Sequence, residues 1–296
     1  MRGSALMVAS MAGFALEDML IKQMAEALPM GQVIALIGLG GTISFGTLTW
    51  ARGDRVWSWA FFSWPILLRG LGEIIATASF VSAIVLTTLS SASAILQATP
   101  LAVTLGAALF LHEPVGWRRW TAIGVGFVGV VLIIRPGLEG FAPASLLAVV
   151  AVGALALRDL AVRRVQRDVT SAQLSMCGFV VVVPTGLLMM LFLGTPPVVP
   201  EAPDLVRLGA AFVVGGLGYY AIVAATRTGD VAVVVPFRYT RLVFAMILGS
   251  LVFGERPDML MLSGAALIVA AGLYTIWRET RVCARSVPVE PGRDAL

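Results

Sequence analysis

Charged residues are scarce in this chain of 296 residues: aspartate, glutamate, lysine and arginine together make up 13%. Soluble domains carry about 25% charged residues. Hydrophobic residues reach 58% here, and the mean hydropathy is +0.92. A soluble fold of this length needs far more polar surface to cover its core. The composition therefore excludes a soluble protein and predicts one whose solvent is the lipid bilayer.

Lysine and histidine each occur once, at Lys22 and His112, and there are two cysteines. A single histidine excludes a multi-histidine metal site. Cys177 lies in an apolar run and Cys283 in the polar C-terminal segment, so the two cysteines do not suggest a disulfide framework. The arginines are spread over short loops and the C-terminal segment without interleaved aromatics, so we expect no nucleic-acid partner. There is no ATP-binding loop. We expect no cofactor.

Apolar runs fill most of the chain. Runs of about 20 residues suit a helix that crosses a bilayer, and the sequence contains ten, at 3–25, 30–50, 66–87, 91–111, 120–136, 143–162, 171–193, 205–226, 231–253 and 259–277. Turn and charge signals separate them. Arg2 and the first run resemble a signal peptide, but Glu17 and Asp18 follow at once and favour an uncleaved first helix.

The two halves of the chain resemble each other. Leu109–Pro114 (LFLHEP) recurs as Leu251–Pro257 (LVFGERP), each copy between two apolar runs. Each half holds five predicted helices, and five is odd, so the second copy must enter the membrane from the opposite side. We expect an all-α integral membrane protein with ten transmembrane helices in two inverted repeats, 1–138 and 139–279, followed by a disordered cytoplasmic tail over 280–296.

Arginine placement predicts the orientation, because basic residues accumulate in cytoplasmic loops. With the N-terminus inside, thirteen basic residues fall on inside segments and four on outside segments or their edges. Both termini are therefore expected in the cytoplasm.

The layout resembles the ten-helix EamA-type branch of the drug/metabolite transporter superfamily, over residues 3 to 279. The resemblance rests on Ala98–Leu101 (ATPL) leading into Phe110–Pro114 (FLHEP), and on Pro236–Tyr239 (PFRY) leading into Phe253–Pro257 (FGERP). It implies a bacterial inner-membrane carrier of amino acids, nucleoside-like metabolites, vitamins or drugs.

Charges inside a membrane helix are costly and point to function. Glu17 lies about 21 Å along the first helix, by helical rise, so we expect Glu17 or Asp18 to line a cavity. A carboxylate there attracts an ammonium group or titrates with coupled protons. The alternative is that these residues snorkel to water near the outer helix end.

The ninth predicted helix carries Arg238, Tyr239 and Arg241 shortly after Pro236, which should kink or break the helix. These side chains suit the capture of a carboxylate or another anionic group. The alternative is that Arg238 and Arg241 pair with Glu17, Asp18 or Glu73 and hold helices together.

Two more residues are cavity candidates. Gln97 lies beside Pro100 on the fourth helix, as the repeat-related counterpart of the ninth-helix cluster. Tyr219 on the eighth helix is suited to stack on a planar substrate, or to serve in ordinary packing. Arg69 and Glu73, four apart on the third helix, suit an intrahelical ion pair.

These observations predict a secondary transporter of a small organic metabolite. An exporter of amino acids or their derivatives is our first hypothesis, because the acids of helix one and the arginines of helix nine suit the two ends of a zwitterion. An importer of a vitamin or nucleoside-like compound, such as riboflavin or S-adenosylmethionine, is the alternative, and a multidrug efflux carrier is a third. No Ser/His pair or metal-ligand cluster suggests an enzyme. For the driving force, both coupling to protons and exchange are considered. For the oligomeric state, both a monomer and a homodimer are considered.

Overall fold

The computed structural model describes the chain except for residues 1, 114, 139, 166–168, 229–230 and 286–296. The described residues form helices and turns, and they include ten helical segments long and apolar enough to cross a membrane. The all-α fold and the ten apolar segments predicted from the sequence are confirmed.

Eight of the ten segments consist of one helix each, and two are built from shorter pieces. The single helices are α1 (Arg2–Met24), α2 (Met30–Ala51), α3 (Trp64–Leu86), α6 (Trp117–Ile134), α7 (Ser145–Val162), α8 (Ser171–Leu193), α9 (Ala202–Thr228) and α12 (Met259–Arg285). The fourth segment joins α4 (Leu89–Leu96) to α5 (Thr99–Phe110). The ninth joins the 3-10 helix η2 (Val235–Tyr239) to α11 (Thr240–Phe253), and the short helix α10 (Val231–Val234) precedes it. A short 3-10 helix, η1 (Trp59–Phe62), precedes α3.

Proline explains both interruptions. Pro100 stands in the first turn of α5, where its missing N–H costs nothing, but its ring excludes a continuous helix through the carbonyl four residues earlier. The sequence predicted one helix over 91–111, and the break between α4 and α5 corrects that expectation. The expected break at Pro236 is present, as the 3-10 helix η2.

The last helix is longer than expected. α12 continues to Arg285, whereas a disordered tail was predicted from residue 280. Residues 280–285 include no proline or glycine, so nothing in the local sequence ends the helix there. The remainder of the predicted tail, 286–296, lies outside the described residues.

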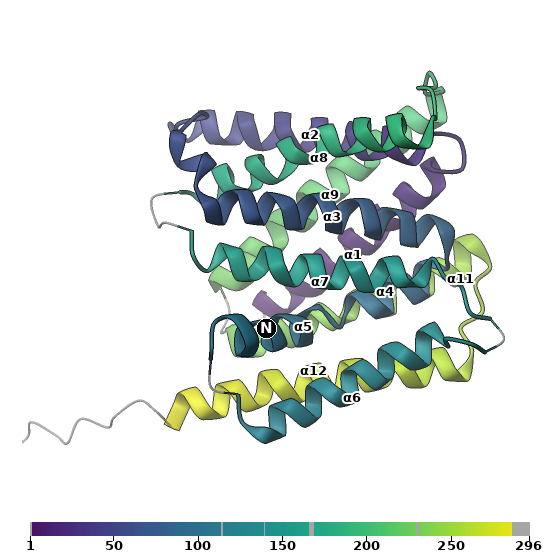
Figure 1. The fold of residues 1–296 in the computed structure, drawn as a ribbon. Helices are drawn as coiled ribbons and strands as arrows, with labels where there is room; N and C mark the ends of the chain where they lie inside the picture. The colour runs from purple at the N-terminus through teal and green to yellow at the C-terminus, as the bar shows by residue number, and fades with distance from the viewer. Residues whose placement is uncertain (1, 114, 139, 166–168, 229–230, 286–296) are drawn as a thin grey trace, which may run out of the picture.

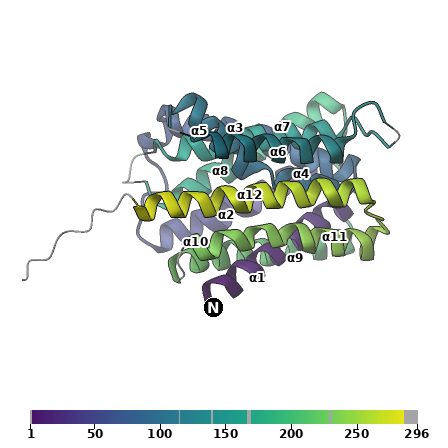
Figure 2. The ribbon, with the colours of Figure 1, turned by 90° about the horizontal axis from the view of Figure 1, so that it is seen from below.

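The helices lie side by side in two layers, with α3, α5 and α7 in one and α1, α9 and α11 in the other (Figures 1 and 2). Both layers mix the two halves of the chain, because α1 packs along α9 and α3 packs along α7. Two further pairs, α2 with α8 and α6 with α12, close the opposite edges of the bundle. Contacts between the halves therefore hold this fold together.

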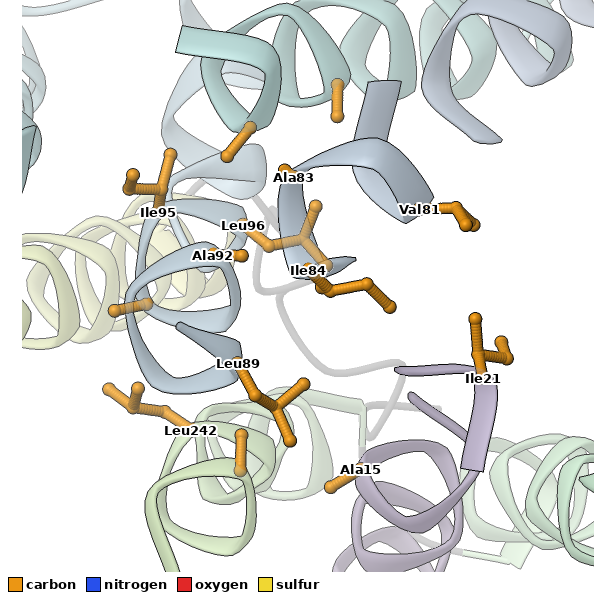
Figure 3. Close-up of a cluster of buried hydrophobic side chains, with 14 of the residues drawn as sticks. Ala15, Ile21, Val81, Ala83, Ile84, Leu89, Ala92, Ile95, Leu96 and Leu242 are labelled. Atoms are coloured by element: carbon orange, nitrogen blue, oxygen red, sulfur yellow. The ribbon is translucent and has the colours of Figure 1, made fainter. Parts of the chain in front are cut away.

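A cluster of buried apolar side chains surrounds the short helix α4. Leu89, Ala92 and Ile95 of α4 are 1% exposed or less, and they lie among residues from α1, α3 and α11 (Figure 3). Ala15 of α1 and Leu242 of α11 belong to the same cluster. The packing holds the break between α4 and α5 in the interior of the bundle.

Candidate functional site

Asp18 and Arg241 form an ion pair between α1 and α11. The Oδ2 atom of Asp18 accepts hydrogen bonds from Nη2 of Arg241 at 2.6 Å and from Nε at 3.2 Å. The side chain of Asp18 is 6% exposed and that of Arg241 is 22% exposed. The rings of Phe14 and Phe80 lie 5.6 and 5.8 Å from the guanidinium. The arginine is thus neutralised by one carboxylate and flanked by aromatic faces.

Glu17 lines a cavity of about 100 Å³ between α1, α2, α8 and α9, whose lining does not include Asp18 or Arg241. Its carboxylate lies against Gly215 of α9, where an added Cβ would stand 2.8 Å from Oε1. Glu17 forms no ion pair with any residue that the structure describes. The carboxylate is therefore free to meet a cationic group of a ligand.

Aromatic rings form the walls of this cavity. Phe45 stacks on Phe179 with 5.4 Å between centroids, and it meets Tyr219 edge to face at 4.8 Å. The hydroxyl of Tyr219 shares a hydrogen bond of 2.7 Å with Ser175, which fixes the ring. Phe212 completes the wall from α9. A volume of about 100 Å³ holds one functional group, so the cavity is suited to anchor part of a larger ligand.

The two interrupted helices meet at their breaks. Gln97, in the gap between α4 and α5, donates a hydrogen bond of 3.2 Å from Nε2 to the backbone carbonyl of Arg238 in η2. Arg238 itself is exposed, whereas Tyr239 is 6% exposed and packs against Gly272 of α12. The buried hydroxyl of Tyr239 has no hydrogen-bond partner among the described residues.

A second charged cluster joins α3 and α7. Arg69 and Glu73 pair at 3.8 Å as an (i, i+4) pair, and Arg158 of α7 adds a contact of 3.5 Å to Glu73. Arg158 also pairs with Asp159 at 2.9 Å. The intrahelical pair predicted on the third helix is confirmed, and the structure extends it to a link between two helices.

The predicted site residues do not form one pocket. Glu17 and Tyr219 line the same cavity. Asp18 and Arg241 form an ion pair with each other, which agrees with the alternative that these charges hold helices together. Gln97 and Arg238 meet through the backbone, and Tyr239 turns toward α12.

The aromatic wall was not predicted from the sequence. Phenylalanines on α1, α2, α8 and α9 line the cavity, and they are Phe14, Phe45, Phe179 and Phe212. Fourteen phenylalanines in apolar runs give no signal that separates these four from the rest.

Comparison with known proteins agrees with this architecture. The profile of the EamA-like transporter family matches residues 1–135 and 142–277. An S-adenosylmethionine uptake transporter of Rickettsia bellii is 28% identical over 230 residues, 75% of each chain. A riboflavin transporter of Vibrio cholerae is 32% identical over 188 residues, 64% of this chain and 62% of that one.

A protein of known crystal structure shares the fold, with a TM-score of 0.56 over 93% of this chain and 98% of its own, at 22% identity. The relatives from Rickettsia bellii and Vibrio cholerae are named as transporters and not as enzymes. With the profile match over both halves and ten apolar helices, the chain is a multi-pass membrane protein that belongs to the EamA-like transporter family.

Proposed function

We propose that this protein is an uptake carrier for a small metabolite that combines a planar heterocycle with a cationic group, with S-adenosylmethionine as the first candidate. The observation that carries the proposal is the unpaired Glu17 carboxylate in a cavity walled by aromatic rings. Aromatic faces attract sulfonium and ammonium groups, and a carboxylate in a site of low dielectric strengthens that attraction. The name of the Rickettsia bellii relative supports the same class of substrate.

Riboflavin is the second candidate. Its planar ring suits stacking on Tyr219 and Phe45, and the name of the Vibrio cholerae relative supports it. Riboflavin carries no positive charge, so Glu17 would act only as a hydrogen-bond acceptor for its hydroxyl groups. The two candidates thus differ in how strongly they depend on the charge of Glu17.

The names of the relatives favour these imported compounds over the amino-acid exporter that was our first hypothesis. The site gives a physical reason for the same preference. A clamp for a zwitterion needs an acid and an arginine that are both available, but Asp18 and Arg241 neutralise each other at 2.6 Å. Glu17 forms no ion pair among the described residues, and no arginine lines its cavity, so this cavity is suited to a cation.

We propose further that residues 1–138 and 139–279 are inverted repeats in the bacterial inner membrane, with both termini in the cytoplasm. The packing supports this arrangement: exchanging the two halves turns the pair α1 with α9 into the pair α7 with α3, and both pairs are present. In such carriers, substrate is exposed to either side in turn as one half moves against the other. We propose that exchange with another metabolite or coupling to protons drives the transport.

Equilibrium binding to the purified protein tests the substrate class. We expect S-adenosylmethionine to bind, and Glu17→Gln to weaken its binding by at least roughly tenfold, since a charge-assisted contact contributes ~1.5–3 kcal/mol. Binding of riboflavin should change less in the same variant. Tyr219→Ala removes a ring from the cavity wall and should weaken the binding of both compounds. Tyr220→Ala is its matched control and should leave binding unchanged, because Tyr220 is 72% exposed and lies outside the cavity. Equal affinity in the protein and in Glu17→Gln would contradict the proposal.

A further inference from the structure

Each membrane-spanning segment crosses the bundle once, so successive turns alternate between its two ends (Figure 1). We call the end at which α1 finishes and α4 begins the Glu255 end. The end at which α5 finishes and α6 begins is the Glu113 end. Glu255 lies between α11 and α12, and Glu113 lies between α5 and α6.

The repeated Glu–Pro signature has the same local geometry in both halves. The residue before each glutamate has positive φ, 53° at His112 and 65° at Gly254, and lies within two residues of the end of the preceding helix. The N–H of each glutamate then donates to the carbonyl six residues earlier, at 3.2 Å for Glu113 and 3.0 Å for Glu255. The two carboxylates are thus presented alike at opposite ends of the bundle.

Each glutamate pairs with a basic residue from the other half of the chain. Glu255 lies 3.4 Å from Nζ of Lys22, at the end of α1. Glu113 lies 2.8 Å from Nη1 of Arg163, at the end of α7. Both ion pairs therefore join the two halves of the chain.

The basic residues also occupy equivalent places. Lys22 follows Asp18 by four residues on the first helix of the first half, and Arg163 follows Asp159 by four on the first helix of the second half. The same kind of ion pair therefore occurs twice, once at each end of the bundle.

The two copies differ in how tightly they are closed. The side chains of Lys22 and Glu255 are 13% and 6% exposed, whereas those of Arg163 and Glu113 are 48% and 49% exposed. An exposed ion pair contributes little, while a buried pair is held by partners in a site of low dielectric. The ion pair at the Glu255 end is thus buried, whereas the pair at the Glu113 end is half exposed; we call the buried contacts around Glu255 the seal.

Backbone groups add to the seal at the Glu255 end. The carboxylate of Glu255 accepts hydrogen bonds from the N–H groups of Leu89 and Ser90, at 2.5 and 3.0 Å, and from the Ser90 hydroxyl at 2.6 Å. Lys22 donates to the carbonyl of Thr87 at 2.6 Å. The start of α4 is thus tied to α1 and to the turn before α12.

A polar cavity of about 440 Å³ lies directly outside this seal. Glu255 and Ser90 line it, together with Arg135, Arg256 and Asp258. Glu255 and Ser90 therefore belong both to these contacts and to the wall of a hollow large enough for a metabolite.

From this geometry we infer that Lys22–Glu255 and Arg163–Glu113 are the two gates of the transport cycle, which open in alternation, and that the structure shows the Lys22–Glu255 gate closed. The inference rests on the proposed carrier function and its inverted repeats. Release of Glu255 frees the start of α4 and opens the path from the polar cavity to the interior. Formation of buried contacts by Glu113 closes the other end.

A thiol buried behind the closed gate reports whether it is open. Ser93 is 2% exposed and lies one helical turn beyond Ser90 on α4. We introduce Ser93→Cys in a Cys177→Ser/Cys283→Ser background and measure its reaction with a membrane-impermeant maleimide, in spheroplasts and in inside-out vesicles separately. Glu255→Gln should raise the rate from the Glu255 end by at least about tenfold, as expected for a shift toward the open state.

Matched variants separate gating from misfolding. Lys22→Met should raise the reactivity like Glu255→Gln, and Lys22→Arg, which keeps the charge, should leave it low. Arg163→Met should slow transport and leave the thiol buried from the Glu255 end. Where a variant fails to fold, a crosslink tests the gate instead. The double variant Lys22→Cys/Glu255→Cys is joined by a short thiol reagent that forms reducible disulfide links. The crosslink should stop transport, and reduction should restore it.

Unchanged reactivity in both Glu255→Gln and Lys22→Met, or full transport in the crosslinked protein, overturns the inference. The labelling needs no substrate. A failure of the gates therefore shows as an unresponsive thiol, and a failure of the proposed function shows as absent flux with a responsive thiol.

Discussion

Single residues decide the electrostatics of this membrane interior, and the pair of Asp18 and Arg241 shows how. Each charge alone is expensive inside a bilayer, but together they satisfy each other at 2.6 Å and hold α1 against α11. Removing one partner of a buried pair leaves the other charge uncompensated, at a cost of ~3–5 kcal/mol.

Arg241→Ala should therefore lower the thermal midpoint of the purified protein and abolish transport. Asp18→Asn should do the same, because it leaves the arginine unpaired. The double variant Asp18→Asn/Arg241→Gln removes both charges, and we expect most of the stability to return. Thermal unfolding in detergent and flux in proteoliposomes are the two readouts. If the double variant were no more stable than either single variant, the pairing would not be what these residues contribute.

The same scale shows what the sequence predicts of the site and what it does not. The charge of Glu17 in an apolar run and the ring of Tyr219 were both recognised, and the structure places them in one cavity. The choice of Asp18 as the partner of Arg241 could not be made, because the two lie 223 positions apart and Glu17 is adjacent. Contacts between helices that are distant in the chain leave no local pattern in the sequence. The same holds for the phenylalanines that four helices bring together around the cavity.

At the scale of helices, proline and capping residues shape the bundle. Asp258 caps α12, because its Oδ1 atom accepts a hydrogen bond of 2.9 Å from the N–H of Met261. The same atom accepts from the guanidinium of Arg135, beyond α6. These contacts, the arginine first, lower the pKa of Asp258 below its ordinary value of 3.8. The cap thus ties the start of α12 to the end of α6.

A group whose pKa is lowered by folding stabilises the fold above its unfolded pKa and loses that contribution as the pH falls through the folded value. Asp258→Ala should lower stability near neutral pH by ~0.5–2 kcal/mol, the usual cost of losing an N-cap. The difference between the protein and the variant should shrink as the pH falls below about 4. Thermal unfolding at several pH values measures it, and a difference that grows toward acid would refute the cap.

Helix positions were largely predictable from apolar runs, because bilayer thickness sets the length of a spanning helix. The break at Pro236 was expected, and the break before Thr99 was not, although Pro100 marks it. Proline in the first turn is compatible with starting a new helix as well as with kinking an old one. The pattern alone does not decide between the two.

In the molecule as a whole, helices from two similar halves are interleaved. The most extensive helix–helix contacts among the described residues each join a helix of the first half to a helix of the second. Such an arrangement links a movement of one half to both ends of the bundle. The aromatic cavity at Glu17 and the charged seal at Glu255 lie on this shared interface. The proposed substrate site and the proposed gate therefore both lie where the two halves of the chain meet.

Counterflow in proteoliposomes tests the central claim most directly. Vesicles that contain the purified protein are loaded with unlabelled S-adenosylmethionine and diluted into the labelled compound. We predict saturable accumulation of label, which unlabelled S-adenosylmethionine suppresses, free amino acids do not, and Glu17→Gln largely removes. If no label accumulated for S-adenosylmethionine, or if amino acids suppressed the uptake equally well, the proposed carrier of a metabolite with a planar heterocycle and a cationic group would be contradicted.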